Sequence, residues 1–365
     1  MIKLDKREEN ILSSLTSLYK MRGYRRYKPV CFEEYSFYQD NKDFLIGKNV
    51  ITFSDLGGKL MAMRPDVTLS LIRHNEIKRG RTEKFFYTEK VYRQSAVGND
   101  YKEISQTGVE VVGAIDSVVI AEIAILICDT LSAVSDDYVL DISHMGFTEG
   151  LLKEFPTQKH LLAELLKTKN LHDFYRLAEK ESYGEKLIEA FKVAVTAVGK
   201  PEAVLERVEN VALNAEMSTA AEELKELCDT LRCIGYSDKI NIDFSAVSNA
   251  EYYNGVIFNG YISDIPHCVL SGGRYDKLLK KMGKEGGAVG FALYLGEIER
   301  YLSRDGDSVD YLILYDGKSR KRAIETAQKR LGEGHSVRLS TDVPATVTVK
   351  NIVDLTEKES VGGKK

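Results

Sequence analysis

The chain has 365 residues and nearly balanced charge, with 51 Lys and Arg against 55 Asp and Glu and a formal net charge of −4. This length predicts two or three domains, and the charge balance argues against a generic polyanion-binding protein without excluding a local basic patch. The five cysteines form no Cys-x-x-Cys pair and lack zinc-finger spacing to histidine, so we expect no disulfides, no metal site and a reducing, cytoplasmic location. The N-terminus lacks an apolar signal segment, and the most apolar stretch, residues 117–134, contains Glu122 and Asp129, so we expect no membrane span.

The first part of the chain is predicted to alternate between helices and strands. Apolar residues between Ile11 and Tyr19 fall on one face of an amphipathic helix over residues 9–22. The aromatic-rich alternation over residues 84–94 predicts a strand, and residues 104–113 return as its antiparallel partner in a long hairpin. The other elements expected here are extended segments at 24–30, 50–54 and 60–63, helices at 65–77 and 117–134, and a strand at 139–144.

The rest of the chain is predicted to hold a helical insertion and a small α/β piece. Residues 148–233 are rich in Leu, Ala, Glu and Lys with almost no strand signal, which predicts helices only. Strand patterns are expected afterwards at 239–244, 255–261, 267–270 and 288–293, then a helix at 296–302, a β-α-β unit at 311–315, 320–331 and 336–339, and a strand at 347–353. We therefore predict an α+β fold, an antiparallel sheet flanked by helices. Its parts would be a core of residues 1–147 and 236–305, a helical insertion of residues 148–235, and a truncated α/β tail of residues 306–365 with a disordered end.

Polar side chains recur on one face of the predicted hairpin. Gln106 and Glu110 are separated by an even number of residues and therefore share a face, with Arg93 on the partner strand. An amide, a carboxylate and a guanidinium together could form the floor of a polar ligand site. The alternative is an exposed, solvated sheet face, which is the more common arrangement.

Two glycine-containing segments are candidates for anion binding. In residues 271–276 (SGGRYD), Gly272 and Gly273 would allow close backbone approach and Arg274 could contact an anion, although a tight turn between a strand and a helix explains the segment equally well. Gly317-Lys318-Ser319 does not complete a P-loop, because the position five residues before Gly317 is a leucine.

The order of these motifs resembles the class II aminoacyl-tRNA synthetase fold, and specifically the histidyl-tRNA synthetase family, over about residues 1–305. The first helix and the segment to Pro29 resemble motif 1, the dimer-forming element, which implies a homodimeric core. Residues 63–68 (MRPDVT), 91–110, 251–253 (EYY), 271–276 and 290–292 resemble further family segments. The resemblance assigns a histidine pocket to Asp66, Thr68, Arg93, Gln106, Glu110, Tyr252 and Tyr253, and a Gly-rich loop to Gly272, Gly273 and Arg274.

Several departures from the synthetase pattern remove groups needed for chemistry. Ser248 stands where the family has an arginine that helps to activate the histidine carboxylate, and Glu297 stands where motif 3 has an ATP-binding arginine. The motif 2 loop at residues 94–100 lacks its usual charged residues, and the piece after Asp310 is about half the expected length of an anticodon-binding domain. Losing one preorganised charge contact typically costs on the order of 10²–10³ in rate, so an active synthetase is not expected.

A histidine pocket without synthetase chemistry is similar to the ATP phosphoribosyltransferase regulatory subunit family. The resemblance implies a subunit with no catalytic residues and no cofactor of its own. It implies assembly with the short-form catalytic ATP phosphoribosyltransferase, the first enzyme of histidine biosynthesis, and L-histidine as a feedback effector, with no role for tRNA. Two alternatives stay open: a divergent active histidyl-tRNA synthetase, and a stand-alone synthetase paralogue that regulates translation.

Overall fold

The computed structural model describes residues 6–45, 49–77, 80–94, 100–245, 252–302, 307–344 and 347–356. The chain divides into two compact units, one formed by Glu9–Ile298 and the other by Glu299–Lys365 together with Met1–Glu8. In the part of the chain that is described, no helix is long and apolar enough to cross a membrane.

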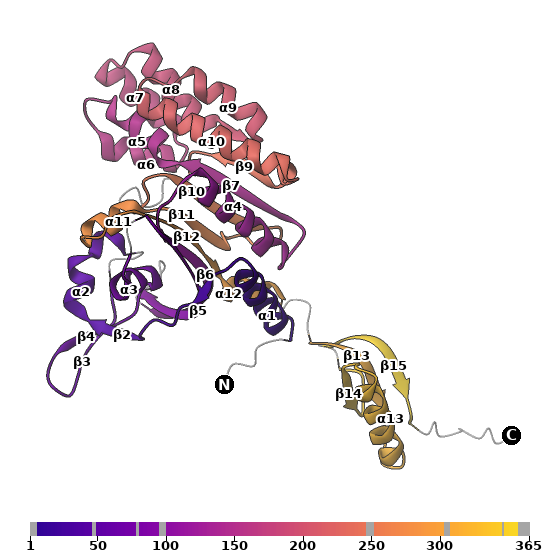
Figure 1. The fold of residues 1–365 in the computed structure, drawn as a ribbon. Coiled ribbons are helices and arrows are strands. Elements are labelled where there is room, and N and C mark those ends of the chain that lie inside the picture. The colour runs from indigo at the N-terminus through magenta and orange to yellow at the C-terminus, as the bar shows by residue number, and fades with distance from the viewer. Residues whose placement is uncertain are drawn as a thin grey trace. The chain divides into compact units, whose positions relative to one another are not determined.

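A nine-stranded sheet forms the centre of the larger unit, with strand order β1-β5-β6-β12-β11-β10-β7-β9-β8. Its longest strands are β5 (Thr82–Gln94) and β6 (Tyr101–Gly113), which pair along their whole length as the predicted antiparallel hairpin (Figure 1). Among the described strands of this sheet, β1 with β5 and β7 with β9 are the only pairs that run parallel. The remaining strands are β1 (Arg25–Arg26), β7 (Tyr138–His144), β8 (Val198–Gly199), β9 (Ile240–Asp243), β10 (Val256–Ile262), β11 (Leu270–Arg274) and β12 (Gly287–Tyr294).

The two faces of this sheet are covered differently. On one face, α1 (Lys6–Met21) and α4 (Ser117–Ser132) pack against apolar strand residues. Tyr19 of α1 is fully buried there, lies 5.8 Å from the ring of Phe86 and hydrogen-bonds Thr130 of α4. Since side chains alternate along a strand, the neighbours of Phe86 point to the other face, where α2 (Tyr35–Asp40), α3 (Val67–His74) and α11 (Asp276–Lys281) lie. The polar side chains of the hairpin belong to this second face.

A separate three-stranded sheet precedes α3, with the order β2-β4-β3. Its strands are β2 (Phe32–Glu34), β3 (Thr52–Ser54) and β4 (Leu60–Met63), and a short 3₁₀ turn, η1 (Lys42–Phe44), follows α2. The sequence indicated β3 and β4 but not β2, whose three residues are too few to show an alternating pattern. Arg64, which is 1% exposed, follows β4 and donates hydrogen bonds to the carbonyls of Pro29, Val30 and Lys90. It thereby fixes the corner from which α3 begins.

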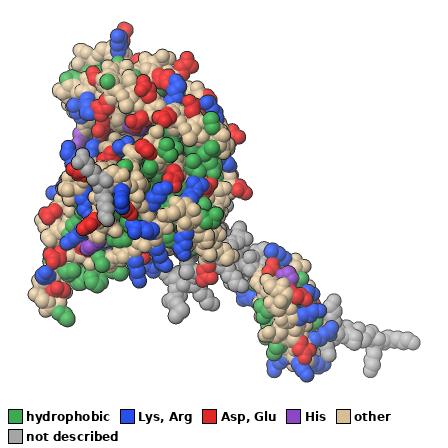
Figure 2. Space-filling view, in the orientation of Figure 1, with side chains coloured by type: hydrophobic (Ala, Val, Ile, Leu, Met, Phe, Trp, Pro, Cys, Tyr) green, Lys and Arg blue, Asp and Glu red, His purple; other side chains and the backbone are tan. Residues whose placement is uncertain are grey.

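The chain between β7 and β9 forms a layer of helices, seen at the top of Figure 1. They are α5 (Met145–Lys153), α6 (Lys159–Lys167), α7 (Leu171–Glu181), α8 (Glu185–Thr196), α9 (Pro201–Asn210) and α10 (Ala215–Cys233). Their core is aromatic, with Phe174 and Phe191 stacked at 3.9 Å. The two-residue strand β8, which the sequence did not indicate, joins this layer to the edge of the sheet. Over these helices, Figure 2 shows Lys and Arg side chains interspersed with Asp and Glu.

The first four residues of the SGGRYD segment lie in a strand rather than a loop, which corrects the prediction of a Gly-rich loop. Leu270 to Arg274 form β11, paired with β10 on one side and β12 on the other, and the strand expected at 267–270 is displaced toward the glycines. A Cβ on Gly272 would come within 2.3 Å of the Gly290 carbonyl oxygen. The glycines therefore allow close packing between the central strands. Close approach of another backbone is one of the usual reasons for glycine inside a strand, as close approach of a ligand is.

The smaller unit contains the predicted β-α-β arrangement. β13 (Asp307–Leu314), α13 (Arg320–Gly332) and β14 (Val337–Ser340) are followed by β15 (Val347–Asp354), and the three strands are parallel in the order β14-β13-β15. Ile313 packs against Ala323 and Ala327 of the helix. Nearly all of the end predicted to be disordered lies outside the described residues.

Candidate functional site

A pocket lies on the polar face of the central sheet, and all seven residues assigned to the histidine pocket line it. Its floor comes from β5, β6, β11 and β12, and α3 and the segment before β10 form its walls. The complete lining is Asp66, Thr68, Tyr87, Arg93, Gln106, Glu110, Tyr252, Tyr253, Ser271, Gly272, Tyr275, Gly290, Phe291, Ala292 and Tyr294.

The strand register explains why the floor residues meet. Arg93 lies opposite Lys102, whose side chain shares a face with those of Gln106 and Glu110 because all three are separated by even numbers of residues. Gln106 is 2% exposed and Glu110 is 3% exposed. The alternative of a solvated sheet face therefore does not describe this structure.

Glu110 is the most strongly perturbed acid of the pocket. The Thr68 hydroxyl donates a hydrogen bond to its Oε1, and the Tyr275 hydroxyl donates one to its Oε2. Burial raises the pKa of Glu110 to about 8, although these two hydrogen bonds act in the opposite direction. The side chain is therefore largely protonated at neutral pH, and a cationic ligand group beside it would favour the ionised form.

Asp66 and Arg93 form a second pair in the pocket. Asp66 caps α3 by accepting a hydrogen bond from the Leu69 amide, so the helix starts at Val67 rather than at the predicted Pro65. The other carboxylate oxygen of Asp66 lies 3.5 Å from Nη2 of Arg93, whose Nε donates to the Pro65 carbonyl. Burial raises the pKa of Asp66, and the positive charge of Arg93 partly offsets this effect.

Gln106 leaves a hydrogen-bond acceptor without a partner in the pocket. Its Nε2 donates to the Tyr87 hydroxyl at 3.4 Å, but its buried Oε1 has no hydrogen-bond partner among the described residues. Leaving a buried polar atom unsatisfied costs about 1–3 kcal/mol. A ligand with an N–H group at this point would satisfy the acceptor.

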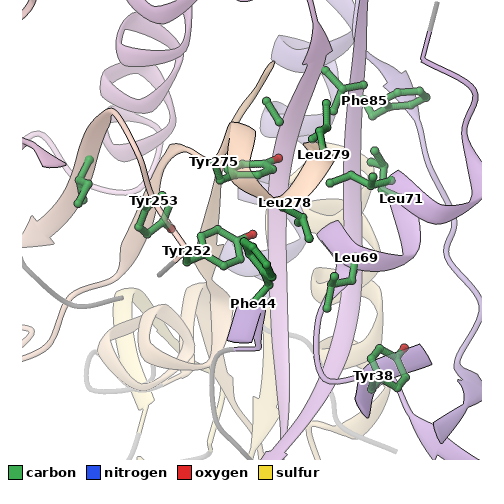
Figure 3. Close-up of a cluster of buried hydrophobic side chains, with 14 of the residues drawn as sticks. Tyr38, Phe44, Leu69, Leu71, Phe85, Tyr252, Tyr253, Tyr275, Leu278 and Leu279 are labelled. Atoms are coloured by element: carbon green, nitrogen blue, oxygen red, sulfur yellow. The ribbon is translucent and has the colours of Figure 1, made fainter. Parts of the chain in front are cut away.

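Tyrosines form the wall of the pocket opposite α3. The ring of Tyr252 lies 4.8 Å from Tyr253 and 5.3 Å from Tyr275, beside Phe44 (Figure 3). Burial raises the pKa of all three tyrosines well above the usual value, so they act as neutral hydrogen-bonding groups. The rings are inclined to one another, by 71° between Tyr252 and Tyr253 and by 43° between Tyr252 and Tyr275, so together they form an aromatic wall of edges and faces.

The sequence did not single out Tyr87, Tyr275 and Tyr294 as pocket residues. The hairpin register could have identified Tyr87, because it faces Gly108, which lies between Gln106 and Glu110 on the same face. Tyr294 faces Gln106 from β12, a pairing that depends on a strand far along the chain. Tyr275 belongs to the quoted SGGRYD segment but follows the strand rather than a loop.

Two of the other predicted residues, Arg274 and Glu297, do not line the pocket, and a third, Ser248, lies outside the described residues. Arg274 does not line it and instead contacts Asp276, the first residue of α11. Glu297 lies in α12 (Leu295–Leu302) and is not among the lining residues. Ser248 and the motif 2 loop residues 95–99 lie outside the described residues. Gly272 is part of the lining, and Gly273 supports it, because a Cβ there would come within 2.8 Å of the Tyr253 ring.

The pocket is closed in this structure. Its volume is about 30 Å³, room for no more than one or two water molecules. Its polar groups pair with one another, Asp66 with Arg93 and Glu110 with Thr68 and Tyr275. Acids, an arginine and an unsatisfied amide oxygen suit a zwitterionic ligand. The described residues hold no group of three or more His, Cys, Asp or Glu placed to bind a metal ion.

Comparison with known proteins gives consistent matches. A family model described as histidyl-tRNA synthetase matches residues 4–298. An ATP phosphoribosyltransferase regulatory subunit from Caldanaerobacter subterraneus is 30% identical over 351 residues, covering 92% of this chain and 90% of that protein. A regulatory subunit from Acetivibrio thermocellus is 24% identical over 369 residues, covering 98% of this chain and 87% of that protein.

Solved structures show the same fold. The chain resembles an ATP phosphoribosyltransferase regulatory subunit/histidyl-tRNA synthetase from Bacillus halodurans with a TM-score of 0.75 and 23% identity, covering 96% of this chain and 94% of that one. It resembles a chain of the ATP phosphoribosyl transferase complex from Thermotoga maritima with a TM-score of 0.65 and 21% identity, covering 80% of this chain and 98% of that one. The predicted α+β, class II synthetase-like fold is thus confirmed. The chain belongs to the histidyl-tRNA synthetase-like family and, within it, to the ATP phosphoribosyltransferase regulatory subunits.

Proposed function

We propose that this chain is the non-catalytic regulatory subunit of ATP phosphoribosyltransferase, required for the first step of histidine biosynthesis and for its inhibition by histidine. The observation that carries the proposal is the 30% identity with a regulatory subunit over 92% of this chain. Its partner would be the short-form catalytic subunit, and its motif 1 region would form a homodimeric core.

The closed pocket would be the site of L-histidine. The ligand ammonium group would bind between Asp66 and the unsatisfied Oε1 of Gln106, and its carboxylate would face Arg93. The imidazole would replace Thr68 or Tyr275 as the hydrogen-bond partner of Glu110. These assignments use the acids and the arginine of the lining, Asp66, Glu110 and Arg93, once each.

Regulation would follow from the energy needed to open this pocket. With a volume of about 30 Å³, the pocket would have to widen to admit histidine, and its internal hydrogen bonds would then separate. Histidine would therefore favour an open arrangement, and any difference between the open and closed arrangements in contact with the catalytic subunit would couple the two sites. The coupling needs no chemistry in this chain, consistent with Ser248 and Glu297 at the two arginine positions.

The proposal is tested by reconstitution. The chain is purified with a tagged short-form catalytic subunit, and transferase activity is measured over a range of histidine concentrations. Glu110→Ala should leave the assembly intact and weaken histidine inhibition at least tenfold. Glu103→Ala is the matched control, since Glu103 lies on the same strand but is exposed and pairs with Lys90. Failure to co-purify would overturn the regulatory role, whereas unchanged inhibition of Glu110→Ala would overturn only the pocket assignment.

A divergent histidyl-tRNA synthetase is the second candidate, favoured by the family model that matches residues 4–298. Histidine-dependent ATP–pyrophosphate exchange distinguishes it directly. We expect no exchange above the level without enzyme, because reversing the sign of the ATP contact at Glu297 and losing the arginine that helps to activate the histidine carboxylate at Ser248 would each cost on the order of 10²–10³ in rate. Robust exchange would contradict the proposal.

A further inference from the structure

A second cavity, of about 300 Å³, lies between the helical insertion and the core of the larger unit. It shares no residue with the closed pocket around Glu110. Part of its lining is apolar and comes from two helices and a strand. The apolar residues are Ile120 and Ala121 of α4, Leu224 and Leu227 of α10, and Val256 of β10. This volume is at the lower end of the range for small-molecule sites, about 300–1,000 Å³.

Arg274 supplies a positive charge at one end of the cavity. Its Nε donates to Asp276 Oδ2 at 2.8 Å, while Oδ1 of Asp276 accepts from the Ala288 amide, so the acid is itself fixed. The arginine stem lies against Gly255, where a Cβ would come within 2.9 Å of it. The two Nη atoms have no hydrogen-bond partner among the described residues. The guanidinium is thus oriented through Nε, with both Nη groups left for another molecule.

Glu223 of α10 supplies a negative charge at the same end. Its Oε2 lies 2.9 Å from Nε2 of His144, and the Nδ1 of His144 accepts from the Gly146 amide. The histidine therefore donates through Nε2, which, with the charge of Arg274, lowers the pKa of Glu223. Oε1 of Glu223 has no partner among the described residues. Asp116 and Glu226 also line the cavity, so its acids outnumber the single arginine.

We propose that this cavity binds a free aliphatic α-amino acid. Its carboxylate would contact the Nη atoms of Arg274, its ammonium group would contact Oε1 of Glu223, and its side chain would lie between Leu227 and Ile120. The excess of acids disfavours a plain carboxylate ligand, and Arg274 disfavours a plain amine. A ligand held in this way would join α10 of the helical insertion to the central sheet. The inference does not depend on the proposed function or on the Glu110 pocket.

The test uses three probes of the same shape: L-leucine, 4-methylpentanoate, which lacks the amine, and 3-methylbutylamine, which lacks the carboxylate. Binding to the full chain is followed by saturation-transfer NMR and calorimetry. We expect saturable binding of L-leucine, with each of the other probes weaker by about tenfold or more. No saturable binding of L-leucine up to about 10 mM, or equal binding of the three probes, would overturn the site.

Substitutions at Arg274 and Glu223 test whether L-leucine binds at these residues. Arg274→Gln and Glu223→Gln should each weaken L-leucine binding about tenfold. Glu222→Gln is the matched control and should bind as the parent chain does, because Glu222 is exposed like Glu223 but does not line the cavity. Glu223→Gln keeps a hydrogen-bond acceptor for His144, so this variant decides the question even if Arg274→Gln fails to fold. Unchanged binding in Glu223→Gln refutes the proposal, and loss of L-leucine binding in Glu110→Gln would mean that the probe occupies the other pocket.

Discussion

The carboxylate of Glu110 lies directly over Gly290 of the neighbouring strand. The two residues are paired in register between β6 and β12, and a Cβ on Gly290 would come within 2.0 Å of Oε2 and 2.4 Å of the Val109 carbonyl oxygen. No rotation of the glutamate removes the second contact, because it involves the backbone. Glycine at this position is therefore what allows an acid to lie flat on the floor of the pocket.

Gly290→Ala is expected to destabilise the protein by about 1–3 kcal/mol, the usual cost of inserting an atom into a packed core. It should also displace the Glu110 carboxylate and weaken histidine inhibition of the assembled complex. Denaturant unfolding and inhibition curves measure the two effects. Gly296→Ala is the matched control, because a Cβ there meets nothing within 4 Å. Equal stability of the two variants would contradict the close approach.

The buried Glu110 should make stability depend on pH. Its pKa is raised from 4.5 to about 8 on folding, so the folded protein retains a proton that the unfolded chain releases between these values. The resulting stabilisation is complete below about pH 4.5 and is lost as the pH rises through about 8. Glu110→Gln cannot ionise, so its stability should rise by about 3–4 kcal/mol relative to that of the parent chain between pH 5 and pH 8.

The measurement for this prediction is urea unfolding of both chains at pH 5, 6, 7 and 8. Glu103→Gln is the control for an ordinary exposed glutamate. Its carboxylate pairs with Lys90, which lowers the pKa of Glu103, so its removal should produce no gain toward high pH. A stability difference between Glu110→Gln and the parent chain that is independent of pH would show that Glu110 is ionised throughout this range.

Local pattern accounts for much of the fold and for the floor of the pocket. The hairpin β5–β6 and the helices of the insertion follow from period-2 and period-3.6 patterns within short windows. Because an even number of residues separates Gln106 from Glu110, the sequence placed both side chains on the same face of the strand. These features need only neighbouring residues, so the sequence contains the information for them.

Long-range packing decides what the sequence could not show. Gly272 and Gly273 were compatible with a turn, and only the approach of Phe291 and Tyr253 explains why a central strand contains two glycines. Arg274 was expected beside the pocket glycines, but strand alternation and its contact with Asp276 direct it elsewhere. The closure of the pocket depends on Tyr275 reaching Glu110, a contact between residues far apart in the chain.

Arg64 is expected to contribute strongly to stability. Its guanidinium satisfies three backbone carbonyls and contacts Glu89 while almost completely buried. Lysine keeps the charge but cannot make these contacts simultaneously, so Arg64→Lys should cost about 2–4 kcal/mol. Arg176→Lys, at an exposed and loosely paired arginine, should change stability by less than about 0.5 kcal/mol. Thermal unfolding that gives similar losses for both would contradict the role of Arg64.

Asp66→Asn separates the capping and electrostatic roles of Asp66. Asparagine is an equally good N-cap, so α3 should persist. The substitution leaves Arg93 buried without a counter-charge and should cost about 2–4 kcal/mol. It should also weaken histidine inhibition, because the ammonium group of the ligand would lose its carboxylate partner.

Asp116→Asn is the matched control. Asp116 caps α4 in the same way, through the Val119 amide, and no ion pair to it is present among the described residues. The free energy of unfolding of this control should lie within about 0.5 kcal/mol of that of the parent chain, and histidine should inhibit its complex as it inhibits that of the parent chain. If the two variants lose equal stability and both keep histidine inhibition, the Asp66–Arg93 pair has no role beyond the cap.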